Sequence, residues 1–315
     1  MTVRLLLVYR PQIEVAYRIS HFAQRASGKV RMSAIPLFSS IVPLAASSDL
    51  WFVDIWGVLH NGVRPFASTV AACEAFRKQG GTALLVTNSP RPHDSVIRQL
   101  DGIGVARSAY DGIVSSGDVS RSLIAAWAGR PILHIGPSRD LPIFAGLGAT
   151  PGASADDADV AVCTGLYDDE TETPENYSEL LQKLKVRNVP MVCANPDLKV
   201  ERGGRIIYCA GAIASAYAAL GGNVSYAGKP YQPIYDLALR TGSDIRGVPV
   251  PKDRVLAIGD GVATDIAGAA GFGIRSVFIA SGIYVGSDES LTGAAGRLFP
   301  AGAPQPVALM QSLVW

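Results

Sequence analysis

From residue 50 onward, short apolar runs alternate with stretches that have helical periodicity. The runs are continuous in Val, Ile and Leu, which is typical of parallel strands buried on both faces. We expect strands at Leu50–Asp54, Thr82–Thr87, Gly112–Ser115, Pro131–Ile135, Val160–Thr164, Pro190–Ala194, Val255–Gly259 and Arg275–Ile279. We expect helices at Ser68–Gln79, His93–Leu100, Asp118–Trp127, Pro174–Lys185, Gly211–Leu220, Gln232–Arg240 and Thr264–Ala270. The alternation predicts an α/β fold with parallel sheets.

Composition excludes several classes of protein. The chain has 315 residues and a formal net charge of +1, so no overall field favours nucleic acid or an anionic membrane. No uncharged apolar stretch reaches the ~18 residues that a membrane span needs. The four cysteines show no CxxC spacing, which argues against a disulfide framework or a zinc site. We therefore expect reduced, buried thiols in a cytoplasmic protein.

The first 31 residues differ from the rest of the chain. They carry six basic residues against the single acid Glu14, a net charge of +5. This pattern fits an organelle transit peptide, a basic tail for an anionic partner, a solvated helix, or a start-site artefact, because Met32 begins a more ordinary N-terminus. We expect residues 1–45 to form an extension outside the fold.

Four polar segments follow predicted strands or precede predicted helices. In a parallel α/β sheet, ligands bind at the carboxyl ends of the strands, so these segments are expected to meet. They are Asp54-Ile55-Trp56-Gly57, Thr87-Asn88-Ser89, Gly228-Lys229-Pro230 and the run from Gly259-Asp260 to Asp265. Taken singly, each reads equally well as a turn, a helix cap or a solvated side chain.

Together these segments form a coherent chemical set. Carboxylates from Asp54, Asp260 and Asp265 at one sheet edge would repel one another unless a hard cation lay among them. Mg²⁺ prefers such oxygen ligands and also accepts a phosphate. Lys229 and the Thr87 hydroxyl would hold the other phosphate oxygens. Asp54 is then free to act as a nucleophile.

These four motifs, in this order, resemble the haloacid dehalogenase (HAD) superfamily over about residues 46–315. The long insert before Lys229 resembles the α/β cap of class IIA, the NagD-like phosphatases. Asn195-Pro196-Asp197, followed by Ala210-Gly211-Ala212, matches that cap, and Ser281-Gly282 also fits. The resemblance implies a doubly wound parallel-sheet core at 46–117 and 227–315, with an inserted α/β cap at 118–226.

The resemblance also implies roles for individual residues. Asp54 would be the nucleophile and a Mg²⁺ ligand, and the backbone carbonyl of Trp56 would be a second ligand. Asp260 would bind the metal directly, with support from Asp265. Thr87 and Asn88 would bind the phosphoryl group. Lys229 would neutralise its charge and orient the nucleophile. The implied activity is hydrolysis of a small phosphorylated metabolite through an aspartyl phosphate.

One position departs from the family pattern. Family phosphatases usually carry Asp-x-Asp in the first motif, and the second Asp is the general acid and base, but this chain has Trp56 there. Tryptophan cannot transfer that proton, which favours substrates with good leaving groups. The alternatives are an acid from His60 or from the cap residues Asp168, Asp169 and Glu170.

Two other functions stay open at this stage. A phosphometabolite sensor or partner protein with little turnover would retain the same binding residues. A dehalogenase also lacks the second Asp, but its last motif lacks the carboxylates that this chain keeps at Asp260 and Asp265. We expect a small phosphorylated molecule as the partner, and neither nucleic acid nor membrane. The sequence leaves the substrate and homo-oligomer formation open.

Overall fold

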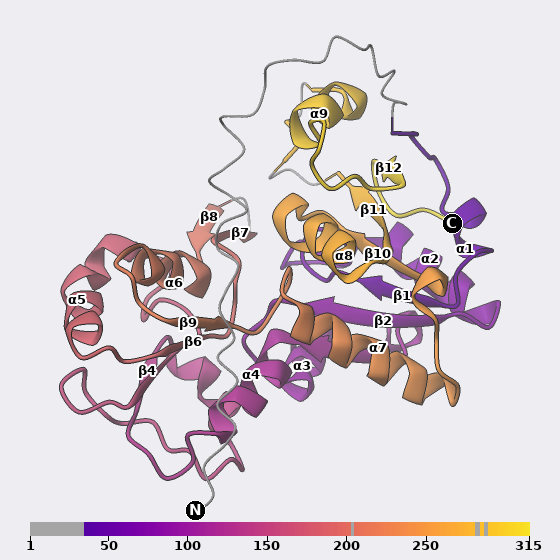
Figure 1. Ribbon diagram of the computed structural model, residues 1–315. Helices are drawn as coiled ribbons and strands as arrows, with labels where there is room; N and C mark the ends of the chain where they lie inside the picture. Colours follow the sequence, from indigo (N-terminus) through magenta and orange to yellow (C-terminus); the bar gives the residue numbers. More distant parts are fainter. Residues whose placement is uncertain (1–34, 203–204, 281–283, 287–288) are drawn as a thin grey trace, which may run out of the picture. The chain divides into compact units, whose positions relative to one another are not determined.

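The computed structural model describes residues 35–202, 205–280, 284–286 and 289–315 (Figure 1). The basic segment 1–31 and the pair Ser281-Gly282 lie outside the described residues. Two parallel sheets and the helices around them make up most of the described chain. The α/β fold class expected from the alternating pattern is confirmed.

The larger sheet has six parallel strands in the order β12-β11-β10-β1-β2-β3. Their bounds are β1 Leu50–Val53, β2 Thr82–Thr87, β3 Gly112–Ser115, β10 Val255–Gly259, β11 Arg275–Ile279 and β12 Ala308–Met310. The chain places β10, a late strand, directly beside β1. This reversal of strand order is the topological switch point, where open α/β sheets bind their ligands.

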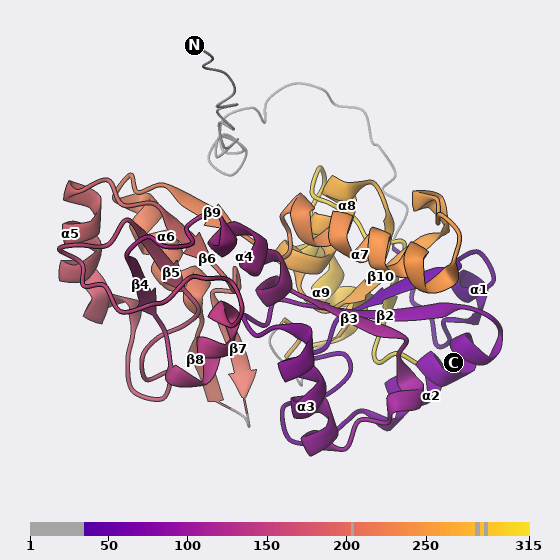
Figure 2. The same ribbon diagram turned by 90° about the horizontal axis from the view of Figure 1, so that it is seen from below.

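Helices cover both faces of this sheet because alternate residues of each buried strand point to opposite sides. Trp51 and Val53 of β1 pack with residues of α2 and α3, whereas Leu50 and Phe52 pack with residues of α7. Figure 2 shows α7 and α8 on one side of the sheet and α2 and α3 on the other. The helices of this part are α1 Val42–Ala45, α2 Ala67–Lys78, α3 His93–Ile103, α7 Gln232–Arg246, α8 Ala267–Phe272 and α9 Leu291–Leu298.

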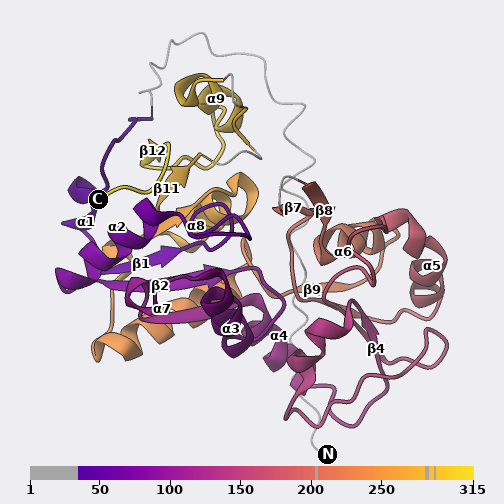
Figure 3. The same cartoon turned by 180° about the vertical axis from the view of Figure 1, so that it is seen from behind.

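The smaller sheet has four parallel strands in the order β4-β5-β6-β9, which are all labelled in Figure 2; Figure 3 shows the sheet from behind, with β4 and β9 labelled. Its elements are β4 Ile132–Ile135, β5 Val160–Cys163, β6 Met191–Cys193, β9 Val224–Tyr226, α4 Ser116–Ala125, α5 Ser178–Val186 and α6 Ala210–Ala219. An antiparallel hairpin, β7 Lys199–Arg202 with β8 Arg205–Tyr208, follows β6. We call this insert, with its hairpin, the cap. Its core contains side chains such as Leu181, Ile213 and Tyr217.

Several elements escaped sequence prediction. The hairpin β7–β8 carries Lys199, Arg202 and Arg205 and so lacks the apolar run that marked the other strands. β9 and β12 are three residues each, which is too short for a clear pattern. The predicted helix Thr264–Ala270 is instead a π turn, Val262–Ile266, followed by α8.

The expectation that residues up to 45 lie outside the fold is corrected for residues 35–45. Ile41 is fully buried in the main core cluster. The Phe38 amide donates to the Leu309 carbonyl at 2.9 Å, and the Ile41 amide donates to the Val314 carbonyl at 2.8 Å. The segment therefore closes the sheet edge at β12, which the sequence pattern did not reveal.

Two further expectations concern chemistry rather than topology. All four cysteines are buried and free, as predicted from their spacing. Within the residues that the structure describes, no helix combines the length and the apolar character needed to cross a membrane.

Candidate active site

Three neighbouring strands deliver the candidate residues to one sheet edge. Asp54 directly follows β1, Thr87 ends β2 and Asp260 directly follows β10. Because β1 pairs with both β2 and β10, these side chains emerge from adjacent strands at the switch point. The structure therefore brings together the residues that the sequence analysis took from widely separated motifs.

Lys229 links two of the carboxylates. Its Nζ donates to Asp54 Oδ1 at 2.7 Å and to Asp265 Oδ1 at 2.7 Å, and all three side chains are buried. The other oxygen of Asp265, Oδ2, accepts from the Gly261 amide at 3.0 Å. The lysine thus fixes Asp54 against a carboxylate that the π turn holds in place.

The electrostatics of this cluster are unbalanced. Burial and the neighbouring carboxylates of Asp265 and Asp260 raise the pKa of Asp54 well above its usual range, although Lys229 opposes the shift. Burial alone would lower the pKa of Lys229, but Asp265 and Asp54 outweigh it and raise that pKa. With all three carboxylates ionised against one ammonium, the cluster would carry a buried charge of −2, which a divalent cation would neutralise.

The donor set fits such a cation. Asp54, Asp260 and Asp265 each offer an oxygen, and these oxygens lie within 4.8 Å of one another. Clustered carboxylate oxygens are the ligands that Mg²⁺ and Ca²⁺ prefer. The Trp56 carbonyl as a further ligand stays a prediction.

Asn88 connects the lysine to the cap. Its Oδ1 accepts from the Lys229 amide at 2.7 Å, and its Nδ2 donates to the Lys229 carbonyl at 3.1 Å and to Asp197 Oδ1 at 2.9 Å. The sequence analysis expected Asn88 to bind the phosphoryl group, and that role stays a prediction. The structure adds that its side chain holds the Lys229 backbone.

Gly57 is required by close packing in the loop after β1. Its φ is +79°, and a Cβ built there would lie 2.1 Å from Asp260 Oδ2. Any side chain at this position would displace the Asp260 carboxylate. Glycine is therefore part of what positions the metal-binding oxygens.

Trp56 and His60 form an aromatic pair in the same loop, with ring centroids 5.0 Å apart. Trp56 lines the cavity described below, whereas His60 is fully buried and is not among the lining residues. The Gly62 amide donates to His60 Nδ1 at 2.8 Å, and burial lowers the pKa of His60 to about 4. This geometry favours a role for His60 in shaping the loop rather than in proton transfer.

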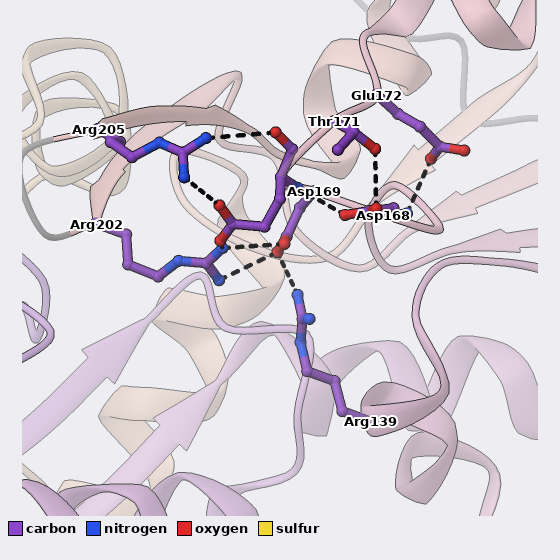
Figure 4. A network of polar contacts seen from close by, with 8 residues as sticks. Arg139, Asp168, Asp169, Thr171, Glu172, Arg202 and Arg205 are labelled. Atoms are coloured by element: carbon purple, nitrogen blue, oxygen red, sulfur yellow. Dashed lines mark hydrogen bonds and ion pairs between the residues drawn. The ribbon is translucent and has the colours of Figure 1, made fainter.

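The three cap acids considered as proton donors are already engaged, and Figure 4 shows the contacts of two of them, Asp168 and Asp169. Asp168 accepts from the Glu170 amide at 2.9 Å and from Thr171 Oγ1 at 2.8 Å, and these bonds lower its pKa. Burial would raise the pKa of Asp169, but the Arg202 and Arg139 guanidinium groups lower it overall. Glu170 is paired with Arg202 and Arg205. Carboxylates held by hydrogen bonds and ion pairs in this way are poorly placed to give a proton to a leaving group.

A cavity of about 450 Å³ connects the carboxylate cluster to the cap, a size suited to a small metabolite. Sequence analysis did not identify several of the residues that line it. Arg91 could have been suspected because it lies four positions after the end of β2, but Arg139, Asp140 and the hairpin residues offered no signal in isolation. The charged and polar residues that line the cavity outside the carboxylate cluster include Arg91, Gln99, Arg139, Asp140, Asp169, Asp197, Lys199 and Arg202.

Comparison with known proteins agrees with this geometry. Residues 51–150 match the family model of haloacid dehalogenase-like hydrolases, and residues 226–307 match a second, HAD-hydrolase-like family model. A crystal structure of a haloacid dehalogenase-like hydrolase from Brucella suis is 47% identical, with a TM-score of 0.79, over 88% of this chain and all of that one.

More distant relatives have named activities. The D-glycerol 3-phosphate phosphatase of Mycobacterium tuberculosis is 27% identical over 76% of this chain, which spans 65% of that relative's length. A crystal structure of glycerol phosphate phosphatase from the same organism, in complex with magnesium, has a TM-score of 0.63 and 22% identity over 84% of this chain and 75% of that chain. That likeness shows the fold alone.

Proposed function

The chain belongs to the haloacid dehalogenase-like hydrolases, and on that basis we propose that it is a divalent-metal-dependent phosphatase acting on a small phosphorylated metabolite. The observation that carries the proposal is the cluster in which Lys229 bridges Asp54 and Asp265 beside Asp260. The retained acids argue against a metal-free dehalogenase. The reduced, buried cysteines support a cytoplasmic location.

The residues divide the chemistry between them. An Asp54 carboxylate oxygen attacks phosphorus, the bond from phosphorus to the leaving oxygen breaks, and an aspartyl phosphate forms. Water then attacks phosphorus, which releases inorganic phosphate and restores the carboxylate. Lys229 orients Asp54 and neutralises phosphoryl charge, and Thr87 supports the phosphoryl oxygens. Mg²⁺, when bound by Asp54, Asp260 and Asp265, supplies the remaining charge neutralisation.

Trp56 sets the expected preference among substrates. The side chain at this position lines the cavity but cannot donate a proton to the leaving oxygen. The leaving group therefore departs as an anion, which favours aryl phosphates, acyl phosphates and phosphoanhydrides over alkyl phosphates. The missing general acid corresponds to a factor of roughly 10²–10⁴ in rate.

The test is phosphate release from esters that span a wide range of leaving-group pKa, with and without Mg²⁺. We expect metal-dependent release, lost in Asp54→Asn and retained in the control Asp94→Asn, which changes an exposed carboxylate of α3. The rate should fall steeply as leaving-group pKa rises. Trp56→Asp should flatten that dependence.

Two results would overturn the proposal. Release that persists in Asp54→Asn would remove the nucleophile from the mechanism. Tight binding of vanadate or beryllofluoride without turnover of any ester would favour a phosphometabolite sensor instead.

A further inference from the structure

The two ends of the cavity carry opposite charge. At the catalytic end, Lys229 faces the carboxylates of the metal cluster. Outside the catalytic cluster, four cationic side chains line the wall against three carboxylates, a net formal charge of +1. The cations are Arg91, Arg139, Lys199 and Arg202, and the carboxylates are Asp140, Asp169 and Asp197. A divalent cation and a phosphoryl group would balance the charge at the catalytic end and leave the positive charge at the other end unbalanced.

Asp169 holds two of the arginines at the cavity wall. Arg202 Nη2 donates to Asp169 Oδ1 at 3.0 Å, and Arg139 Nη2 donates to Asp169 Oδ2. Figure 4 shows the Asp169 carboxylate between the two guanidinium groups, which reach it from different elements. Arg139 lies in the short helix Ser138–Phe144 and Arg202 in β7. Asp169 therefore positions two guanidinium groups, and Glu170, which is shared with Arg205, also contacts Arg202, so two carboxylates face the three guanidinium groups of this network.

Arg91 is a third guanidinium at this end, and it comes from the larger sheet's side of the cavity. Its Nη2 donates to Gln99 Oε1, and within the described residues no carboxylate is in ion-pair contact with it. Burial lowers the pKa of Arg91, with Asp140 opposing the shift. A guanidinium has five N–H donors in a fork that matches carboxylate and phosphate. Most of these donors on Arg91 are unused.

The carboxylate of Asp140 does not neutralise the excess positive charge of the arginines. Asp140 is buried, and burial raises its pKa despite the nearby Arg139 and Arg91. Its carboxylate is thus less ionised than an exposed one at a given pH, so it compensates the arginines less. Partly buried cations with unused donors are typical of a site for an anion.

Resting on the phosphatase function proposed above, we propose that the cationic end of the cavity binds a second anionic group, a carboxylate or a second phosphate, carried by the leaving group of the substrate. Arg91 supplies a guanidinium fork that contacts no carboxylate of the described residues, and Arg139 and Arg202, held by Asp169 and Glu170, supply the surrounding positive charge. The substrate class is therefore a phosphate ester whose leaving group is itself an acid.

The experiment uses three aryl esters that share one ring: phenyl phosphate, 3-carboxyphenyl phosphate and 1,3-phenylene bisphosphate. The first two release phenols of nearly equal acidity, so the comparison isolates the second anion. Initial rates are measured with Mg²⁺ for the wild-type chain and for Arg91→Gln, Arg91→Lys and Arg205→Gln. Arg205 is the matched control because it pairs with Glu170 in the same network but does not line the cavity.

We expect the wild type to prefer at least one acidic ester over phenyl phosphate in kcat/KM, mainly through a lower KM. Arg91→Gln should lower that ratio roughly 10- to 100-fold, the value of a charge-assisted hydrogen bond. Arg91→Lys should keep part of the preference, and Arg205→Gln should keep all of it. A preference for 3-carboxyphenyl phosphate would indicate that the site binds a carboxylate, and a preference for 1,3-phenylene bisphosphate would indicate a second phosphate.

Equal kcat/KM for all three esters, or a ratio that Arg91→Gln leaves unchanged, would overturn the inference. Either result leaves the phosphatase function intact, because phenyl phosphate is still hydrolysed. Absence of metal-dependent phosphate release from every ester would instead overturn the proposed function and the inference with it. A melting curve for each variant shows whether it is folded. If Arg91→Gln does not fold, the ratio of kcat/KM values is compared between the wild type and Arg91→Lys instead.

Discussion

Removing the lysine and removing the nucleophile should shift the stability of the metal-free protein in opposite directions. Lys229→Met takes away the only ammonium that contacts Asp54 and Asp265 in the described residues, and leaves two buried carboxylates without it. Asp54→Asn instead removes one charge from a cluster that would carry −2 with all three carboxylates ionised, while the amide oxygen can still accept from Lys229. The first change should destabilise the fold and the second should stabilise it.

The magnitude follows from the burial of the pairs. Removing one partner of a buried ion pair costs about 3–5 kcal/mol. At about 2 °C per kcal/mol for a chain of this size, the melting temperature of Lys229→Met should fall by about 6–10 °C. Mg²⁺ at 100 times its Kd adds about 2.7 kcal/mol of stability to the wild type, or about 5 °C. Asp54→Asn should lose most of that response.

The direction for Asp54→Asn depends on the sign of its pKa shift. The carboxyl ionises near 3.8 in the unfolded chain, and its pKa is raised in the fold. The fold therefore favours the protonated form, and its contribution to stability is lost as the pH rises through the folded pKa. At a pH above its unfolded pKa, the Asp54 carboxyl therefore opposes folding, and an asparagine does not.

Thermal unfolding followed by circular dichroism, in EDTA and in Mg²⁺ near neutral pH, measures all these shifts. Lys183→Met on α5, an exposed lysine of the cap, is the control for loss of one positive charge. The electrostatic account is refuted if Lys229→Met melts in EDTA no lower than this control. It is also refuted if Asp54→Asn melts below the wild type.

Three further perturbations probe other parts of the structure. The pKa of His60 falls from 6.5 to about 4 in the fold, so the stability that neutral His60 contributes is complete above pH 6.5 and is lost as the pH falls towards 4. Because the raised pKa of Asp54 acts in the opposite direction, the comparison is with His60→Asn, which keeps an acceptor for the Gly62 amide; over this window the free energy of unfolding from denaturant titration should fall by about 3 kcal/mol more in the wild type than in His60→Asn. Gly57→Ala should weaken Mg²⁺ binding at least tenfold by calorimetry, because its Cβ would displace the Asp260 carboxylate; an unchanged affinity would mean that the close approach of Gly57 to Asp260 does not determine the metal site. Asp169→Asn removes the ion pairs with Arg139 and Arg202 and should lower the free energy of unfolding by about 1 kcal/mol at low salt. Chemical denaturation in 1 M salt should show a smaller difference from the wild type, because salt screens these pairs.

The strands that carry the catalytic residues were predictable because they are buried on both faces. β1, β10 and the centre of β2 are uninterrupted runs without charged residues, so the strand ends, and hence Asp54, Thr87 and Asp260, could be located from the sequence. Their adjacency follows from the rule that ligands bind at the carboxyl ends of parallel strands. The ion pairs of Lys229 follow from no local pattern, since they join residues 175 and 36 positions apart.

The cationic end of the cavity was beyond sequence reasoning for a related reason. Arg139, Asp169 and Arg202 come from three segments of the cap that meet through side chains alone. Each residue read singly is an ordinary surface charge, and the sequence suggested Asp169 only as a proton donor. Its pairing with Arg202 depends on the β7–β8 hairpin, whose four-residue strands begin with Lys199 and Arg205 and gave no clear apolar run.

The place of β1 within its sheet has a consequence for local unfolding. This strand has a hydrogen-bonded partner on each side, and its residues are buried. Exposing its amides requires separation of the central strands, an opening whose free energy approaches that of global unfolding. Amide hydrogens of β1 and β10 should therefore exchange among the slowest in the chain. The nucleophile sits at the end of the most persistent part of the structure, so loops and hairpins that contact the leaving group can fluctuate, or diverge in sequence, without loosening Asp54.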